Sequence, residues 1–218
     1  VIYDKEADTY SYNYGNKNMG QYMVKSYEHM KNEIENYDVV SFDIFDTLLQ
    51  RVISDTDAIQ KLVEKRLNIH FGEETEFAKI RELAEIECRR KHPDRDCDID
   101  DIYMEMSKQT GWTKEKTEYA KKTELETEIS LIRPKTEMIE VLKYTKHTLG
   151  KKVYLISDMH LRKKDILWML DICKVKEEDF DEFLLSSEID KRKDNGTMWE
   201  HYVSLEKGKR CIHIGDNE

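Results

Sequence analysis

Four groups of polar residues each follow a short apolar stretch that is typical of a buried strand. They are Asp43 with Asp46 and Thr47, Ser157 with Asp158, the basic run from Lys191 to Lys193, and Gly215 with Asp216. In open parallel sheets, ligands bind beyond the carboxyl ends of the strands, so residues at these positions are candidates for chemistry. Two carboxylates suit a hard cation, and a hydroxyl with an ammonium suits the phosphate that such a cation bridges.

The apolar stretches themselves predict a parallel sheet. They cover residues 38–42, 153–156, 182–185 and 211–214. Helical patterns over 162–173 and 196–205 separate the later stretches, and this β-α alternation indicates a parallel sheet covered on both faces. A further helix is expected over 21–36, because apolar residues recur there at three- and four-residue spacing.

A long helical insertion follows the first predicted strand. After Leu49 the pattern stays helical for about 80 residues, the length of a small helical bundle. We expect helices over 56–67, 73–91, 99–109 and 113–131, with Asp55 capping the first and a loop over 92–98. Pro134 predicts the start of the next helix, and Gly150 its C-cap.

Together the motifs resemble the haloacid dehalogenase (HAD) superfamily, most closely its predicted hydrolases that carry F-D-x-F-D-T-L-L. Residues 42–49 match this first motif, Ser157 ends the second, Lys193 is the third, and residues 214–217 (I-G-D-N) form the fourth. The resemblance implies an α/β fold, a HAD-like Rossmannoid parallel sheet core with an inserted α-helical (C1-type) cap. We expect a poorly ordered lead-in over 1–19, a split core over 20–51 and 132–218, and the cap over 52–131.

The resemblance also implies a role for each matching residue. Asp43 would be the nucleophile, forming an aspartyl-phosphate that water then hydrolyses. Mg2+ would be bound by Asp43, the Phe45 carbonyl and Asp216. The phosphoryl group would be held by three side chains, those of Thr47, Ser157 and Lys193.

Several of these roles have an alternative explanation. Lys191 and Arg192 compete with Lys193, which is preferred because it lies three residues before Gly196, at the entrance to a predicted helix. Each strand-end acid has a structural alternative as a cap of the following turn, and Ser157 has one as a partner of the next helix.

The chain departs from the superfamily pattern at the residue that usually donates the proton. Phosphatases of the superfamily usually read D-x-D-G-T, and here Phe45 stands at the second Asp. General acid-base help is typically worth about 10²- to 10⁴-fold, so its loss predicts a slow or specialised enzyme. Asp46, which we assign as the second catalytic residue, or else Asp158, would replace it; alternatively Asp46 only fixes the turn.

The expected function is a Mg2+-dependent hydrolase acting on a small phosphorylated metabolite, with the cap mobile and enclosing the substrate. Two alternatives stay open: a catalytically weak or silent binding or regulatory domain, and a dehalogenase-type hydrolase. Some proteins with this first motif accompany polysaccharide-assembly glycosyltransferases, so an attached glycosyltransferase domain is the implied partner. A receiver domain is excluded, because the helical insertion has no place in that fold.

Composition limits the class of protein further. The chain has 46 acidic and 36 basic residues, a formal net charge of -10, which argues against binding to duplex nucleic acid. Its four cysteines lack C-x-x-C spacing, and no apolar run resembles a signal peptide or a membrane span. We therefore expect a cytoplasmic protein with reduced cysteines.

Overall fold

A four-stranded parallel sheet forms the centre of the larger lobe. The computed structural model describes residues 2–4, 9–11, 19–53, 55–93 and 95–215. The strand order is β7 (Glu182–Leu185), β6 (Lys152–Ser157), β3 (Val39–Phe42) and β8 (Cys211–Ile214), with every neighbouring pair parallel. The predicted strands are thereby confirmed to within one or two residues.

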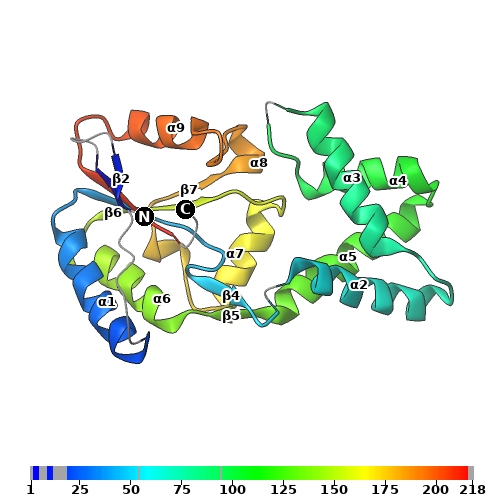
Figure 1. Cartoon of the computed structure of the whole chain (residues 1–218), viewed down its shortest axis with the longest axis horizontal. Helices are drawn as coiled ribbons and strands as arrows, with labels where there is room; N and C mark the ends of the chain where they lie inside the picture. The colour runs from blue at the N-terminus through cyan, green and yellow to red at the C-terminus, as the bar shows by residue number, and fades with distance from the viewer. Residues whose placement is uncertain (1, 5–8, 12–18, 54, 94, 216–218) are drawn as a thin grey trace.

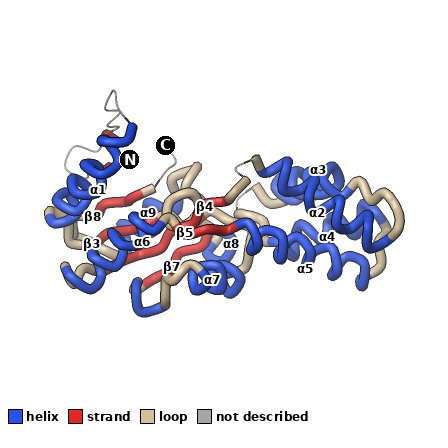
Figure 2. The backbone as a smooth tube through the Cα atoms, turned by 90° about the horizontal axis from the view of Figure 1, so that it is seen from below, coloured by secondary structure: helices blue, strands red, loops and turns tan. Residues whose placement is uncertain are grey.

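Helices cover both faces of this sheet, as Figures 1 and 2 show. On one face, alternate residues such as Val40 and Phe42 pack in a buried cluster with α1 (Met19–Glu35), α6 (Thr136–Lys143) and α7 (Lys163–Ile172). On the other face, Val39 and Tyr154 pack against α9 (Thr197–Leu205). The β-branched and aromatic strands are apolar on both sides because both sides are buried, as expected for a parallel sheet.

The remaining elements of this lobe are short. A π-helical turn (Tyr144–Thr148) extends α6, a 3-10 turn covers Glu177–Asp179, and α8 (Ser186–Ile189) follows β7 directly. Gly150 follows the π-helical turn with a φ of 64°, the left-handed conformation that ends the helical run.

Four helices form a second lobe, to the right in Figure 1. They are α2 (Thr56–Phe71), α3 (Phe77–Lys91), α4 (Ile99–Thr110) and α5 (Lys114–Leu131). Asp55 caps α2 by accepting the Asp57 N–H, as expected, and Asp98 caps α4 in the same way through Asp101 N–H. The fold class is confirmed: a parallel α/β core with an inserted helical cap.

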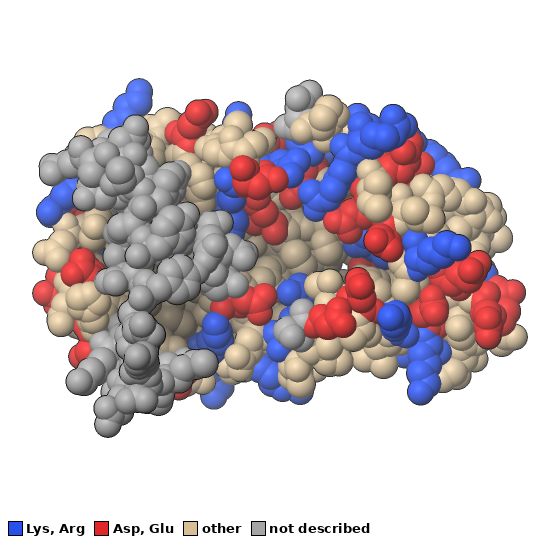
Figure 3. Space-filling model, in the orientation of Figure 1, with Lys and Arg blue, Asp and Glu red and all other residues tan. Residues whose placement is uncertain are grey.

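The cap contains a buried ion pair. The Arg81 guanidinium donates through Nε to Glu124 at 3.2 Å, and the Tyr103 hydroxyl donates to the same carboxylate at 2.5 Å. All three side chains are buried. Burial favours a neutral Glu124, but Arg81 beside it holds the pKa of that carboxyl below its usual value. On the surface of the cap, basic and acidic side chains are interspersed and exposed to solvent (Figure 3).

Two short strands join the cap to the core, and sequence periodicity did not predict either of them. They are β4 (Leu49–Arg51) and β5 (Ile132–Pro134), which pair antiparallel with Leu49 opposite Pro134. The expected helix start at Pro134 is therefore wrong, and α6 begins at Thr136. A proline is tolerated here because it ends an edge strand and needs no N–H in the ladder.

The cap is also held to the core away from these linkers. The Ile99 N–H donates to the His160 carbonyl at 2.7 Å, Arg162 Nε donates to Asp100 Oδ2 at 2.7 Å, and the Ser186 hydroxyl donates to Asp96 Oδ2 at 2.7 Å. These contacts come from the 95–100 segment, whose residues meet the loop after β6 and the start of α8, a pairing that helical periodicity does not reveal.

Two short strands lie near the N-terminus, where the sequence shows little periodicity. They are β1 (Ile2–Asp4) and β2 (Thr9–Ser11), and they form an antiparallel pair.

Cys88 and Cys97 form a disulfide, so the expectation of four reduced cysteines is wrong. The fold of the cap brings these two together, which their spacing alone did not suggest. Among the described residues, none of the helices has the length and apolarity needed to cross a membrane.

Candidate functional site

The carboxyl ends of β3, β6 and β8 meet at one edge of the sheet. In the strand register Phe42 lies beside Leu155 of β6 and beside Ile214 of β8. The next residue, Asp43, donates its N–H to the Ile214 carbonyl at 2.8 Å, so its backbone is fixed by the last bond of the ladder. The starts of the first and fourth motifs and the end of the second are therefore placed side by side by the pairing of their strands.

The third motif reaches this edge through the side chain of Lys193. Its ammonium donates to Asp43 Oδ1 at 2.9 Å, and the Asp43 side chain is only 5% exposed. The competing Arg192 instead pairs with Asp194. The Lys193 carbonyl accepts the Gly196 N–H at 3.1 Å, and Gly196, at a φ of 81°, is the N-cap of α9. The turn into α9 thus presents Lys193 to Asp43.

Asp158 anchors the same loop from the end of β6. Its Oδ2 accepts the Lys193 N–H at 2.7 Å, whereas its Oδ1 is buried with no hydrogen-bond partner. Burial raises the pKa of this carboxyl to about 6, against the lowering effect of the Lys193 backbone and ammonium. With this pKa, the Asp158 carboxyl loses its proton just below neutral pH. Its hydrogen bond to the Lys193 N–H positions the loop that carries Lys193.

A large cavity opens over these residues. Its volume is about 1230 Å³, and its lining includes Asp43, Phe45, Ser157, Asp158 and Lys193. The side of α9 that carries Trp199 continues the wall away from Asp43. The cavity places a carboxylate, a hydroxyl and an ammonium on one ligand-sized space, the combination that suits an anionic substrate.

Asp46 and Thr47 form the turn that follows β3, and they differ in their access to the cavity. Asp46 has a φ of 58°, its N–H donates to the Leu49 carbonyl at 2.6 Å, and its own carbonyl accepts from Lys135. Its side chain is 51% exposed and lies at the cavity wall. Thr47 is buried and is not among the residues that line the cavity. The phosphate-binding role of Thr47 and the catalytic role of Asp46 stay predictions.

Phe45 lies in the cavity wall beneath a cation. Its ring is nearly buried, and the Arg51 guanidinium lies 4.9 Å from the ring centroid. Arg51 also donates to Glu128 Oε2 of the cap at 3.0 Å and lies 3.9 Å from Asp46 Oδ2. At the position where the superfamily usually has an acid, this chain therefore has an aromatic ring covered by an arginine.

The fourth motif is described as far as Gly215, and Asp216 lies outside the described residues. A Cβ at position 215 would lie 3.0 Å from His213 Nε2 and 3.4 Å from the Asp43 Cβ, so only glycine fits without displacement. His213 is itself held by Ser41, whose hydroxyl lies 2.8 Å from Nδ1. Burial lowers the pKa of His213 well below its usual value. A neutral imidazole therefore packs under the glycine.

The chain resembles known proteins in its structure and not in its overall sequence. No family model and no curated protein sequence matches the chain. Among solved structures, the magnesium-bound YfnB of Bacillus subtilis has a TM-score of 0.51 at 14% identity, covering 83% of this chain and 80% of the other. A HAD phosphatase from Thermococcus onnurineus has a TM-score of 0.50 at 18% identity, covering 83% and 77%. The chain has the HAD-like fold.

Sequence reasoning missed part of this candidate site. Arg51 was not singled out, because β4 was not predicted and nothing placed its side chain over Phe45. The anchoring of the Lys193 loop by Asp158 was also missed. Its only sequence signal was the position of Asp158 directly after Ser157 at a strand end. Asp158 and Lys193 lie 35 residues apart, and Arg51 is brought over Phe45 by the turn between β3 and β4, so periodicity predicts neither contact.

The pKa of Asp158 leads to a test of stability against pH. The folded-state pKa of about 6 exceeds the usual value of 3.8, so the folded protein binds this proton more tightly than the unfolded chain. Binding of this proton stabilises the folded protein fully below about pH 4, and the stabilisation is lost as pH rises through 6. Asp158→Asn keeps an acceptor for Lys193 N–H but removes the titration. Relative to wild type, the variant should gain about 1 to 2 kcal/mol between pH 4 and 7, a value discounted for partial exposure.

Urea unfolding at pH 4.5 and 7 measures this difference. The matched control is Asp190→Asn, a change of the same chemistry at an exposed aspartate, which should follow the wild-type pH dependence. A constant difference between Asp158→Asn and wild type at both pH values would contradict the assignment.

Proposed function

We propose that this protein is a Mg2+-dependent hydrolase that removes the phosphoryl group from a small phosphorylated metabolite. The observation that carries the proposal is the contact of the Lys193 ammonium with Asp43 at the mouth of a cavity that Ser157 also lines. A buried carboxylate paired with a lysine, on a cavity that a hydroxyl also lines, can attack a phosphorus atom while the cation offsets the charge of the phosphoryl oxygens.

Each residue would act on the substrate in a defined way. Asp43 would attack phosphorus, the bond from phosphorus to the leaving oxygen would break, and an aspartyl-phosphate would form on its carboxylate. Lys193 and Ser157 would donate hydrogen bonds to the phosphoryl oxygens. Water would then attack the acyl phosphate and release inorganic phosphate and Asp43.

The oxygen donors at this edge suit Mg2+. Asp43 supplies a carboxylate with two oxygens, one of which takes the bond from Lys193. The backbone on either side of Phe45 is fixed, because Leu49 N–H donates to the Ile44 carbonyl at 2.8 Å and Asp46 N–H donates to the Leu49 carbonyl. Asp43, the Phe45 carbonyl and Asp216 would hold the ion, an all-oxygen set that Mg2+ prefers. When bound, Mg2+ would reduce the repulsion between the carboxylate and the phosphate.

Phosphate release from a panel of phosphorylated metabolites, with Mg2+ and with a chelator, tests the proposed function. The panel should include sugar phosphates, acyl phosphates and nucleoside diphosphates, because the cavity accommodates ligands of these sizes and they differ in leaving group. We expect release from some members of the panel, and only with Mg2+. Release that is unaffected by the chelator would overturn the metal dependence, and no release from any member would favour a binding domain.

Metal binding can be tested separately from turnover. Asp216→Ala removes one of the two proposed carboxylate ligands, so we expect its Mg2+ affinity to fall by more than about tenfold in titration calorimetry. Asp194→Ala is the control, since Asp194 is an exposed acid that lines the same cavity and has no proposed ligand role. Equal Mg2+ binding by wild type and Asp216→Ala would contradict the assignment.

A further inference from the structure

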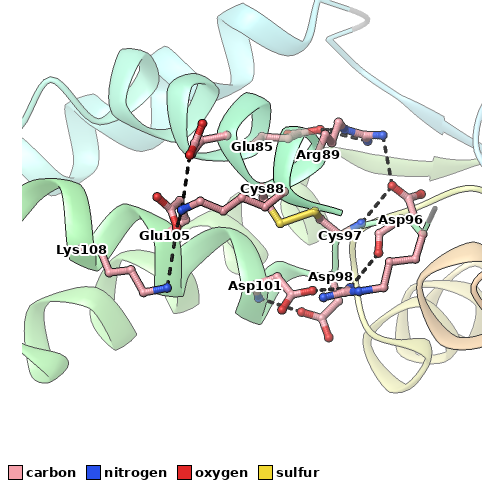
Figure 4. Close-up of a disulfide and its surroundings, with 12 residues drawn as sticks. Glu85, Cys88, Arg89, Asp96, Cys97, Asp98, Asp101, Glu105 and Lys108 are labelled. Carbon is pink, nitrogen blue, oxygen red and sulfur yellow. Dashed lines mark hydrogen bonds and ion pairs between the residues drawn. A yellow bond between two sulfur atoms is a disulfide. The ribbon is translucent and has the colours of Figure 1, made fainter. Parts of the chain in front are cut away.

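The Cys88–Cys97 disulfide joins the end of α3 to residues 95–100 of the cap (Figure 4). Cys88 is in the last turns of α3, and Cys97 is in the segment of residues 95–100, which we call the latch segment. Both sulfur-bearing side chains are buried. The covalent bond therefore fixes the latch segment against the body of the cap.

The latch segment reaches the core through a buried hydrogen-bond relay. Met159 N–H donates to the Ser186 hydroxyl oxygen at 3.1 Å, and that hydroxyl donates to Asp96 Oδ2 at 2.7 Å. Ser186 and Asp96 are both buried. Met159 lies in the cavity wall, two residues after Ser157, so the relay connects the residue before Cys97 with the edge of the candidate site.

The position of Asp96 depends on the cap as well as on the core. Its Oδ1 accepts the Cys97 N–H at 3.1 Å and lies 3.1 Å from Arg89 Nη1, and dashed lines in Figure 4 mark both interactions. Arg89 is one residue after Cys88 in α3. Farther along the latch segment, Ile99 N–H donates to the His160 carbonyl at 2.7 Å. The latch segment is therefore held by the disulfide, by the ion pair of Asp96 with Arg89, and by the hydrogen bonds of Asp96 and Ile99 to the core.

We propose that the Cys88–Cys97 disulfide is a redox-sensitive clamp, whose reduction releases the latch segment from residues 159–162 and loosens the cap over the candidate site. The reductant is a dithiol. One of its thiolates attacks a sulfur of the disulfide and breaks the S–S bond, and its second thiol resolves the mixed disulfide. The protein gains two electrons and two protons as two thiols, and the dithiol is oxidised to a disulfide. Without the bond, the latch segment has more freedom, and the bonds of Asp96 and Ile99 to the core are less well fixed.

The number of free thiols in the denatured protein tests whether the disulfide is present. Without reductant, alkylation should modify Cys173 and Cys211 alone, and after dithiothreitol it should modify all four cysteines. Four modified cysteines without reductant would overturn the proposal. The carboxylate of Asp101 lies within 4.8 Å of both sulfurs, so a metal ion bound by these three residues is the alternative. If a chelator without dithiol makes Cys88 and Cys97 reactive to alkylation, a metal and not a disulfide protects them, and the proposal is overturned.

Hydrogen exchange followed by mass spectrometry then measures the release. On full reduction, amides in the latch segment and in residues 159–162 should exchange at least about tenfold faster, while β3 and β6 stay protected. Cys88→Ala/Cys97→Ala should exchange at the faster rate with or without dithiol. Unchanged exchange in reduced wild type, or a dithiol response in the double variant, would overturn the proposal.

A second variant keeps the test decisive if the double variant does not fold. Ser186→Ala removes the hydroxyl of the relay and leaves the disulfide intact. Residues 159–162 should exchange faster in this variant without any dithiol, and reduction should add a smaller increase than in wild type. If Ser186→Ala exchanges like oxidised wild type, the relay does not hold the two parts together and the clamp is refuted.

Discussion

Replacing Asp43 by Asn should lower the release of phosphate by on the order of 10⁴-fold or more, whichever substrate of the panel is used. An amide is a very poor nucleophile, so no aspartyl-phosphate can form on residue 43. The change also removes the charge that Lys193 contacts at 2.9 Å. Steady-state phosphate release and acid-quench trapping of phosphorylated protein measure both effects.

The control for this prediction is Lys193→Met, which removes the ammonium but leaves the carboxylate. It should lower turnover while still allowing some phosphorylated protein to be trapped, because the nucleophile remains. Thermal unfolding of each variant separates loss of chemistry from loss of fold. Activity in Asp43→Asn within about tenfold of wild type would show that Asp43 is not the nucleophile.

The parts of this structure that local sequence determines were predictable. The strand Val39–Phe42 and the acid that follows it were placed correctly, because a short run of mainly apolar residues before a polar cluster has few other structures open to it. The cap helices followed from their periodicity and from caps such as Asp55. These features depend on residues within a few positions of one another.

The parts that were not predictable depend on pairing between distant segments. The β4–β5 pair joins residues more than 80 positions apart, and each strand is only three residues long, too short for an alternating pattern to be distinctive. The contacts of Asp158 with Lys193, of Arg51 with Phe45 and of Cys88 with Cys97 span fewer residues, but they too depend on how the chain turns back on itself and not on local periodicity. The resemblance to known motifs indicated which acids to consider, but not what surrounds them.

The surroundings of Phe45 make its replacement the second decisive prediction. With no acid to protonate the leaving oxygen, the wild-type rate should depend steeply on leaving-group pKa, so that aryl and acyl phosphates react and alkyl phosphates barely do. Phe45→Asp should raise the hydrolysis of alkyl phosphates by up to about 10²- to 10⁴-fold, the usual contribution of a general acid. The measurement is kcat/KM for an aryl and an alkyl phosphate in both proteins.

Arg51 determines how much of that gain the single substitution reaches. Its guanidinium lies over the ring of Phe45, so it would lie close to a carboxylate at position 45 and would favour the charged form, which cannot donate a proton. Glu128 shares the charge of Arg51, at 3.0 Å, and limits this effect. Combining Phe45→Asp with Arg51→Gln should therefore increase the alkyl-phosphate rate further, and Phe45→Asn should give no gain because an amide is not an acid. If wild type already hydrolyses alkyl phosphates rapidly and Asp46→Asn abolishes that activity, then Asp46 is the acid, and the absence of an aspartate at position 45 has no catalytic cost.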